Sequence, residues 1–401
     1  MRRPSRCPSV PIRRAAAWLS LGSVLALQAI GPYEYLRVAP YLRHVTATEV
    51  TVAFEMIESR AARVRFGVGD RRDRVIEDAP ACLHTVRLTG LAPGQVHTYV
   101  VSWQQGDGWR DLPPRPFVTA PLDDRPFTFA VVGDTQDQPE IWQQVAAQVE
   151  AARPAFVVHV GDLVGQGCDA QAWWREFFRP ARLLLATVPI LPVPGNHEED
   201  GPPWYRYMAP DGGGPCWRSR YGGVEFFGID SNHPCGRGSV QYEWLAHALS
   251  DSTARWRIVM HHHPVYSSDA DDYGDTGDGV AASGDPRVQD LAALYEAAGV
   301  DLVLSGHVHG YERTWPLRAG VVDRQRGVTY VVTGGAGGYL DRFSAVPSWF
   351  SATVRPVHHH LLVFVEGDRL TLRAHDMTGH WLDEVVLGPR LPERVVAAAG
   401  P

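Results

Sequence analysis

Residues 127–136 read FTFAVVGDTQ, an apolar run that stops at Gly133 and is followed at once by the carboxylate of Asp134. The pattern returns in FVVHVGDLVGQG (156–167), PILPVPGNHE (189–198), RIVMHHHPVYSS (257–268) and DLVLSGHVHGYERT (301–314). Each run is rich in β-branched and aliphatic residues, which indicates a buried strand. Because ligands bind beyond the carboxyl ends of strands in α/β sheets, the runs predict one site built from Asp134, Asp162, Asn196, His262, His307 and His309.

These six side chains offer oxygen and imidazole donors and no thiolate, a set that suits Zn, Fe or Mn. Six ligands are more than one tetrahedral ion needs. Two ions about 3.5–4 Å apart, joined by a bridging carboxylate, would use the whole set and are suited to phosphoryl transfer. The sequence therefore predicts a dinuclear metal centre and leaves the identity of the metal open.

The region from about residue 126 onward alternates strands with helical stretches, which are 139–152, 169–186, 239–252 and 285–299. Such alternation is typical of α/β proteins. After residue 309 the chain is again rich in strands, while residues 269–285 (DADDYGDTGDGVAASGD) predict a long solvated loop. We therefore expect an α/β domain at 126–378, followed by a C-terminal strand and tail at 379–401.

Residues 33–121 predict a separate all-β domain. Apolar residues alternate with polar ones in EVTVAFEM (49–56) and in RVRFGV (63–68), and two more strands surround an Ala-Pro-Gly turn within 84–103. Alternation interrupted by a turn about every ten residues is typical of a β-sandwich.

The first 30 residues have the organisation of a secretory signal peptide, with a basic segment before an apolar run at 15–29. That run of about 15 residues is short for a membrane span, and we expect cleavage and export to the periplasm or the medium; an uncleaved anchor is the alternative. The chain has a formal net charge of −7 at pH 7, and loss of the basic segment makes it more acidic. An acidic chain argues against nucleic-acid binding.

Four cysteines follow Cys7, which lies in the predicted signal peptide: Cys82, Cys168, Cys216 and Cys235. An even number in an exported protein suggests disulfides. Cys216 and Cys235 flank a predicted hairpin, and we expect them to be linked. Cys82 and Cys168 either pair or stay free.

The series Gly-Asp, Gly-Asp, Gly-Asn-His-Glu, His-x-Pro-x-Tyr and Gly-His-x-His resembles the calcineurin-like metallophosphoesterase superfamily. Within it, APYLRHVTATEVTVAFE, VRLTGLAPGQVHTYVV, GSVQYEWLAHAL and GHVHGYERT are similar to the purple acid phosphatase branch, whose N-terminal domain is fibronectin-like. The resemblance covers about residues 35–378. It implies a four-layer α/β/β/α metallophosphoesterase sandwich at 126–378, preceded by a small fibronectin/Ig-like β-sandwich at 33–121.

The resemblance also implies a role for each site residue. Asp162 matches the carboxylate that bridges the two metals. His197 matches the histidine that faces the substrate, where it would stabilise the phosphoryl oxygens or protonate the leaving group. The first metal is then bound by Asp134 and His309, and the second by Asn196, His262 and His307.

Two positions depart from the purple acid phosphatase pattern. That branch carries a tyrosine three residues after the bridging aspartate, and its phenolate binds ferric iron; Gly165 stands here instead. Two residues after the first aspartate the branch has glycine, whereas Gln136 could contact a metal or the substrate. These departures put the purple colour, the ferric iron and the acid pH optimum in doubt. His263, Tyr266 and Tyr311 lie near ligands in the sequence and are candidates for the substrate pocket.

We therefore expect an exported, acid phosphatase-like phosphoesterase that hydrolyses phosphomonoesters of small molecules by attack of a metal-bound hydroxide. Its cofactors would be two divalent or trivalent ions of Fe, Zn or Mn. One alternative is a phosphodiesterase or phospholipase-type activity on the same scaffold, and another is a non-catalytic module that binds phosphate or a partner. We expect no nucleic-acid binding and no stable membrane span after signal cleavage, and the oligomeric state stays open.

Overall fold

The structure is a computed structural model that describes residues 32–388 except 209, 211–213, 271, 274–282, 345 and 347. The predicted signal peptide and the last part of the predicted C-terminal tail, from residue 389, lie outside the described residues. Within the described residues, no helix is both long enough and apolar enough to cross a bilayer.

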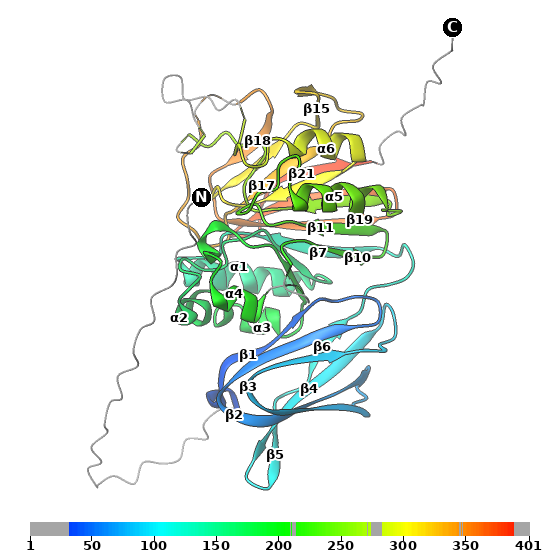
Figure 1. The fold of residues 1–401 in the computed structure, drawn as a ribbon, viewed down its shortest axis with the longest axis vertical. Coiled ribbons are helices and arrows are strands. Elements are labelled where there is room, and N and C mark those ends of the chain that lie inside the picture. Colours follow the sequence, from blue (N-terminus) through cyan, green and yellow to red (C-terminus); the bar gives the residue numbers. More distant parts are fainter. Residues whose placement is uncertain are drawn as a thin grey trace, which may run out of the picture.

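The first of two large sheets has twelve strands (Figure 1). Half of it is ordered β21-β20-β19-β7-β8-β9. The bounds of these strands are β7 (Phe127–Val132), β8 (Val157–His159), β9 (Ile190–Pro192), β19 (His359–Glu366), β20 (Arg369–Asp376) and β21 (Trp381–Leu387). Strands β7, β8 and β9 are parallel to one another, and the last three strands join them as antiparallel neighbours.

The second sheet has seven strands in the order β10-β11-β12-β13-β17-β14-β18. They are β10 (Trp217–Tyr221), β11 (Val224–Gly228), β12 (Trp256–Met260), β13 (Leu302–Ser305), β14 (Tyr311–Thr314), β17 (Thr329–Thr333) and β18 (Ser351–Arg355). Strands β11, β12, β13 and β17 are parallel. A two-stranded ladder of β15 (Leu317–Arg318) and β16 (Val321–Val322) stands apart from it.

Helices cover the outer face of each sheet. The first sheet is covered by α1 (Pro139–Ala152), α2 (Ala170–Ala172), the π-helical turn η2 (Trp173–Phe178), α3 (Arg182–Leu185) and α4 (Pro202–Tyr207). The second is covered by α5 (Val240–Ser250) and α6 (Leu291–Ala298). The helical stretch predicted at 169–186 contains α2, which runs directly into η2, and then α3. The break between η2 and α3 falls at Pro180, which lacks the N–H that a continuous helix needs.

Side chains alternate between the layers as the strand period requires. Phe129 of β7 faces the second sheet and packs edge-on against Phe226, with the ring centroids 5.2 Å apart. Its neighbour Ala130 faces the helices instead, and Phe227 of β11 packs in the cluster under α5 and α6. The order helix, sheet, sheet, helix is the predicted four-layer α/β/β/α sandwich, and the predicted fold class is confirmed.

The N-terminal domain is all-β, as predicted. Besides a short 3₁₀ turn, η1 (Pro32–Tyr35), it contains β1 (Leu36–Arg43), β2 (Val50–Val68), β3 (Arg74–Leu88), β4 (Val96–Gln105), β5 (Gly108–Asp111) and β6 (Arg115–Val118). The two strands predicted at 49–56 and 63–68 are one long strand, β2. Register shifts between Glu55 and Ala62 interrupt its pairing with β3, and such bulges bend a strand while it continues.

Strand β1 joins this domain to the larger one. It pairs with β2 on one side and, in parallel, with β9 on the other, where Arg43 lies opposite Ile190. The Tyr41 hydroxyl and Arg43 Nη1 donate to the carbonyl oxygen of Tyr207, at 2.9 and 3.0 Å. One hydrogen-bonded sheet therefore runs through both regions, and the domain boundary at 121–126 stays a prediction.

Candidate metal centre

The predicted ligands all follow strands of the two parallel arrays. In the first sheet, Asp134 follows β7, Asp162 follows β8 and Asn196 begins the 3₁₀ turn η3 (Asn196–Glu198) after β9. In the second sheet, His262 follows β12, while His307 and His309 follow β13.

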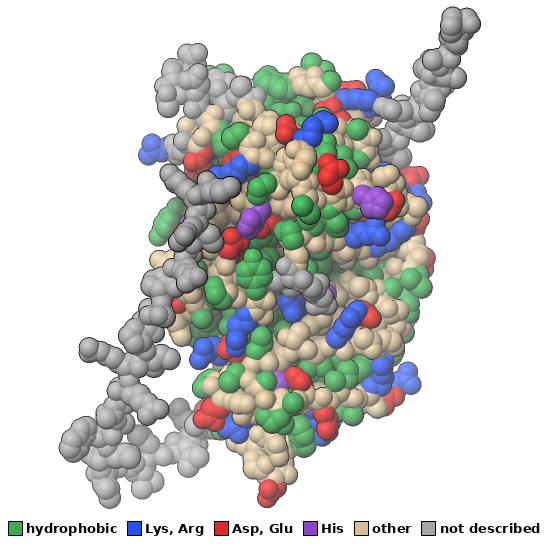
Figure 2. Space-filling view, viewed as in Figure 1, with side chains coloured by type: hydrophobic (Ala, Val, Ile, Leu, Met, Phe, Trp, Pro, Cys, Tyr) green, Lys and Arg blue, Asp and Glu red, His purple; other side chains and the backbone are tan. Residues whose placement is uncertain are grey.

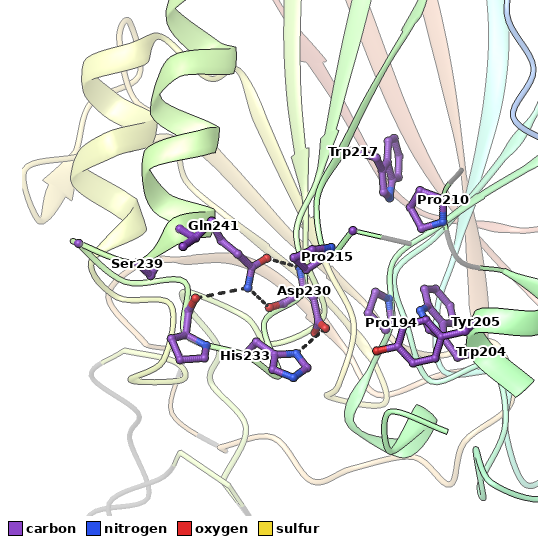
Figure 3. A pocket seen from close by; sticks show the side chains of 14 residues that line it. Pro194, Trp204, Tyr205, Pro210, Pro215, Trp217, Asp230, His233, Ser239 and Gln241 are labelled. Atoms are coloured by element: carbon purple, nitrogen blue, oxygen red, sulfur yellow. Dashed lines mark hydrogen bonds and ion pairs between the residues drawn. The ribbon is translucent and has the colours of Figure 1, made fainter. Parts of the chain in front are cut away.

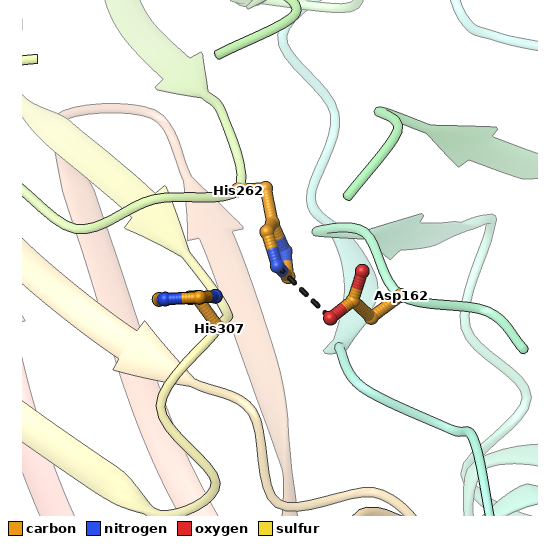
Figure 4. A group of neighbouring side chains, drawn as sticks. All are labelled: Asp162, His262 and His307. Carbon is orange, nitrogen blue, oxygen red and sulfur yellow. Dashed lines mark ion pairs between the residues drawn. The ribbon is translucent and has the colours of Figure 1, made fainter. Parts of the chain in front are cut away.

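The side chains of these residues contact one another. His262 Nε2 lies 3.1 Å from Asp162 Oδ2 and 3.0 Å from Asn196 Oδ1. His307 Nδ1 lies 2.9 Å from the same Asn196 oxygen. The ligand atoms of Asp162, His262 and His307 all lie within 4.8 Å of one another (Figure 4). His309 Nε2 and Asp134 Oδ1, 3.5 Å apart, form a second pair. The structure thus brings together the residues that the sequence proposed as ligands.

The pKa values of these residues indicate that the site needs more positive charge to balance its buried carboxylates. Burial raises the pKa of Asp134 to about 6. Burial also disfavours charge on Asp162, but the charge of His262 and its hydrogen bond outweigh that effect and hold the pKa of Asp162 well below its usual value. For His262 the opposing effect of burial is outweighed by the charge of Asp162, which raises the histidine pKa to about 9. Bound cations would supply the same compensation without protons.

Two buried oxygens test whether metal ions fit. Asp134 Oδ2 and Gln136 Oε1 are buried and have no hydrogen-bond partner in the part of the chain that the structure describes, although buried polar atoms normally have one. A Cβ atom at Gly306 would stand only 2.3 Å from Asp134 Oδ2, so glycine keeps that side of the oxygen open. Together with the imidazole and amide donors around them, these oxygens form a donor set that Fe, Zn or Mn accepts.

Backbone strain is concentrated at the same residues. Asp134, Asp162 and His307 have positive φ angles of 56°, 55° and 71°. Non-glycine residues adopt this left-handed region at a cost, and such residues cluster at functional sites. Gly161, at φ 99°, allows a close approach, since a Cβ there would lie 2.5 Å from His262 Nδ1. The Nδ1 atom of His262 hydrogen-bonds the Val160 carbonyl at 2.9 Å, which directs Nε2 toward the ligands.

His197, the predicted catalytic residue, is half-buried beside the ligands. Its backbone N–H donates to Asp162 Oδ1 at 2.8 Å. Its Nδ1 donates to the carbonyl oxygen of Gly165 at 2.9 Å, so Nε2 is the nitrogen without a proton in the neutral ring. The residue that replaces the phenolate ligand therefore orients this imidazole through its backbone.

Glu198 joins two of the ligand loops. Its carboxylate is buried and accepts three backbone hydrogen bonds, from Asp162 N at 2.9 Å, Leu163 N at 2.8 Å and Gly195 N at 2.6 Å. Burial and the charge of Asp162 raise the pKa of Glu198 to about 8. This side chain therefore fixes the loops after β8 and β9 relative to each other.

The three predicted substrate-pocket residues have different surroundings. His263 lies at the centre, with its ring centroid 4.6 Å from that of His307. Tyr311 instead belongs to the core between the sheets, and its hydroxyl donates to Asp383 Oδ2 at 2.7 Å. Tyr266 packs among aromatic rings of the outer cluster under α5 and α6. The structure therefore does not bring the two tyrosines together with the ligands.

Sequence reasoning missed the loop after β11. Asn232 Nδ2 donates to the carbonyl oxygen of Gly195 at 2.9 Å. His233 bonds Asp230 Oδ2 through Nδ1, at 2.7 Å, and lies 3.3 Å from Asp200 Oδ2 through Nε2. The signal was present, because VEFFGIDSNH at 224–233 is a sixth apolar run that ends in Asp, Asn and His.

The region of the predicted solvated loop at 269–285 also reaches the centre. Asp272 Oδ2 lies 3.6 Å from His307 Nε2. Two residues beyond the loop, Arg287 donates a hydrogen bond to His263 Nε2. Neither contact has a recognisable signal in the sequence: Asp272 comes from the aperiodic stretch, and Arg287 from the start of the predicted helical stretch at 285–299.

A cavity of about 540 Å³ adjoins the loop that carries Asn196. Its lining includes the aromatic rings of Trp204, Tyr205 and Trp217 and also Pro194, two residues before Asn196 (Figure 3). The size and the mainly apolar walls suit a small organic group.

The predicted disulfide between Cys216 and Cys235 is wrong. Both thiols are free, and each donates a weak hydrogen bond elsewhere: Cys216 to Gln241 Oε1 at 3.5 Å and Cys235 to the Arg287 carbonyl oxygen at 3.4 Å. Nearness of two cysteines in the sequence did not fix the direction of their side chains.

Comparison with known proteins extends this description. Residues 127–311 match the calcineurin-like phosphoesterase family. The chain is 32% identical over 228 residues to the probable inactive purple acid phosphatase 24 of Arabidopsis thaliana, which covers 48% of this chain and 36% of that protein. It is 27% identical over 346 residues to acid phosphatase type 7 of Homo sapiens, which covers 76% of each chain.

A solved structure, the purple acid phosphatase PPD1 of yellow lupin (Lupinus luteus) seeds, superimposes with a TM-score of 0.77 at 19% identity, over 88% of this chain and 75% of that one. At this identity the likeness supports the fold. The chain spans only 36% of the length of the Arabidopsis relative. The family match at 127–311 nevertheless includes every candidate ligand. Residues 127–311 of the chain therefore form a calcineurin-like phosphoesterase domain, and the homologues and the solved structure support the purple acid phosphatase-like branch.

Proposed function

We propose that the protein is an exported, dinuclear metal-dependent phosphoesterase that hydrolyses phosphomonoesters. The observation that supports this proposal most is the convergence of ligand side chains from two sheets around buried, unpaired oxygens of Asp134 and Gln136. The proposed export rests on the N-terminal segment alone, which lies outside the described residues.

The contacts suggest how two ions would be shared. The second would be held by Asn196, His262 and His307, which surround one Asn196 oxygen. The first would be held by Asp134 and His309, with Gln136 as a further oxygen donor. Asp162 would bridge the two. When bound, two such ions neutralise charge on the phosphoryl group and activate water for its displacement.

Side chains of the protein would bind the phosphoryl group, position the ligand loops and receive the organic group of the ester. His197 is held by Gly165 and by Asp162. When the ring is protonated, its Nε2 can donate a hydrogen bond to a phosphoryl oxygen or a proton to the departing alkoxide. Glu198 fixes the spacing between the loops that carry Asp162 and Asn196. The aromatic cavity next to Pro194 would receive the organic part of the ester.

The experiment combines metal analysis with parallel kinetics. Purified protein is analysed for bound Fe, Zn and Mn and is then assayed with p-nitrophenyl phosphate and bis(p-nitrophenyl) phosphate, before and after removal of metal with a chelator. We expect two ions per chain and metal-dependent turnover of the monoester. Faster turnover of the diester would show that the protein is a phosphodiesterase, and the proposed metal-dependent hydrolysis would stand. Because the Arabidopsis relative is named as probably inactive, the decisive negative result is a fully metal-loaded protein that binds phosphate and hydrolyses neither ester.

A further inference from the structure

Arg287 brings a positive charge to the edge of the candidate metal centre. It lies in the turn before α6, and about half of its side chain is exposed, at 54%. The base of the side chain is anchored, because its backbone N–H donates to Asp285 Oδ1 at 2.8 Å and its Nε lies 3.7 Å from the same oxygen. Its Nη1 donates to His263 Nε2. Its Nη2 makes no hydrogen bond within the described residues and is available to a ligand.

The partners of Arg287 are themselves held in place. His263 Nδ1 and Ser231 Oγ are 2.8 Å apart. Because His263 Nε2 receives a hydrogen from the arginine, Nδ1 carries the ring proton and donates it to Ser231. The second oxygen of Asp285 accepts from the Tyr273 hydroxyl at 3.3 Å. The guanidinium is therefore positioned from both ends, which lowers the entropy lost when it binds a ligand.

The distance from the metal ligands decides what Arg287 would bind. The guanidinium contacts His263 and Asp285, and in the described part of the chain it makes no hydrogen bond or ion pair with any of the six proposed ligands. His263 and Asp285 are in turn next to His307: the ring centroids of the two histidines are 4.6 Å apart, and ligand atoms of His263, Asp285 and His307 lie within 4.8 Å of one another. The guanidinium is thus beside the ligands that would surround the reacting phosphorus and outside their set. That separation suits the next charged group of a substrate rather than the phosphoryl group under attack.

The chemistry of the side chain narrows the class of ligand. A guanidinium presents planar, paired donors that match phosphate oxygens, and its hydrogen bonds to anions are stronger than neutral ones. We propose that Arg287 forms an anion subsite beside the metal centre, which binds a second phosphate carried by the substrate. The inference rests on the proposed function, and it makes compounds with two neighbouring phosphate groups the preferred substrate class.

The test measures binding and does not require turnover. Inorganic phosphate and methylenediphosphonate, which cannot be hydrolysed, are titrated into metal-loaded full-length protein by calorimetry. We expect the wild type to bind the diphosphonate more tightly. Arg287→Gln should weaken that binding about tenfold or more, the effect of losing one charge-assisted contact, and should change phosphate binding less than about twofold. The diphosphonate affinity of Arg287→Lys should lie between those of the wild type and Arg287→Gln, because lysine keeps the charge and loses the paired donors.

The matched control is Arg369→Gln. Arg369 begins β20 at the opposite end of the first sheet from the ligands, and its Nε donates to Thr371 at 3.3 Å. This variant should bind both anions like the wild type. Metal content is measured for every variant, so that loss of metal is recognised.

Three results would overturn the subsite: equal weakening of both anions in Arg287→Gln, no weakening of either, or a wild type that binds the diphosphonate no more tightly than phosphate. The proposed function fails separately, through absence of hydrolysis. A protein that discriminates the two anions through Arg287 but hydrolyses no ester would retain the subsite and lose the catalytic assignment. A protein that hydrolyses monoesters but binds both anions without a contribution from Arg287 would retain the catalytic assignment and lose the subsite.

Discussion

Replacing Glu198 should test whether one buried carboxylate holds the metal loops together. Its two oxygens accept from three backbone N–H groups, one each in Asp162, Leu163 and Gly195. Leaving a buried donor unpaired costs about 1–3 kcal/mol. Glu198→Ala leaves three backbone N–H groups without an acceptor and should lower the free energy of unfolding by at least about 3 kcal/mol. Glu198→Gln puts an amide NH₂ where one acceptor oxygen was, and should cost about 1–3 kcal/mol.

The pH dependence gives this prediction a second observable. In the metal-free protein the pKa of Glu198 is raised to about 8 by burial and by the charge of Asp162. A raised acid pKa means that the folded state holds the proton more tightly than the unfolded state. The stabilisation of the folded state by this proton is therefore complete below the pKa of the unfolded chain, about 4.3. It is lost as the pH rises through the folded-state pKa of about 8. Glu198→Gln lacks this titration, so the difference between the two proteins should be larger at pH 5 than at pH 8.

The assay is urea unfolding of chelator-treated protein, followed by tryptophan fluorescence at both pH values, together with competition measurements of metal affinity. Loss of the shared anchor should weaken metal binding about 10–100-fold, as is usual when a group that orients ligands is removed. Glu225→Gln is the matched control, because Glu225 is a buried carboxylate of β11 that accepts from Ser252 at 2.6 Å. The control should alter stability and leave metal affinity unchanged. A Glu198→Gln protein with wild-type midpoints and wild-type metal affinity would refute the reasoning.

Four further outcomes are expected. Asp162→Ala should lose both ions, because it removes the bridging carboxylate; full occupancy by metal analysis would contradict the bridge. His197→Ala should keep both ions and lose about 10²–10⁴-fold in kcat, whereas loss of metal would make His197 a ligand. Iron-loaded protein should show no phenolate-to-iron absorption band in the visible, since Gly165 carries no phenol; a band that disappears on reduction would reverse this. Burial lowers the pKa of His233, but its hydrogen bond to Asp230 and the charge of Asp230 outweigh burial and raise it above 6.5. The stabilisation is then present below 6.5 and is lost as the pH rises through the raised pKa; NMR titration should find the raised value and should find it lower in Asp230→Asn.

The sequence predicted the layers and the ligands because both depend on local chemistry. A buried strand that stops at glycine and is followed by Asp or His places the charged group at the sheet edge, whatever the rest of the chain does. Asp134, Asp162 and His307 illustrate this: each follows an apolar run, and each occupies the strained left-handed backbone that such a turn requires.

The rest depended on contacts between distant segments. Tyr311 lies two residues after His309, yet it begins β14 and packs in the core between the sheets, where its hydroxyl donates a hydrogen bond to Asp383. Arg287 belongs to the predicted helical stretch at 285–299, but it lies in the turn before α6 and hydrogen-bonds His263. Cys216 and Cys235 are close along the chain, but their thiols donate to different acceptors. None of these directions is encoded in residue type or spacing.

The pairing of β1 with β9 has a consequence for how the protein can be cut. A recombinant phosphoesterase region that starts near residue 126 would lack β1 and would leave one side of β9 exposed as an edge. Unpaired edges invite association with other chains. The damage would begin at Ile190, only six residues before Asn196. The N-terminal β domain therefore supports the strand that leads to Asn196, and shortened versions made for crystallisation or assay should retain it.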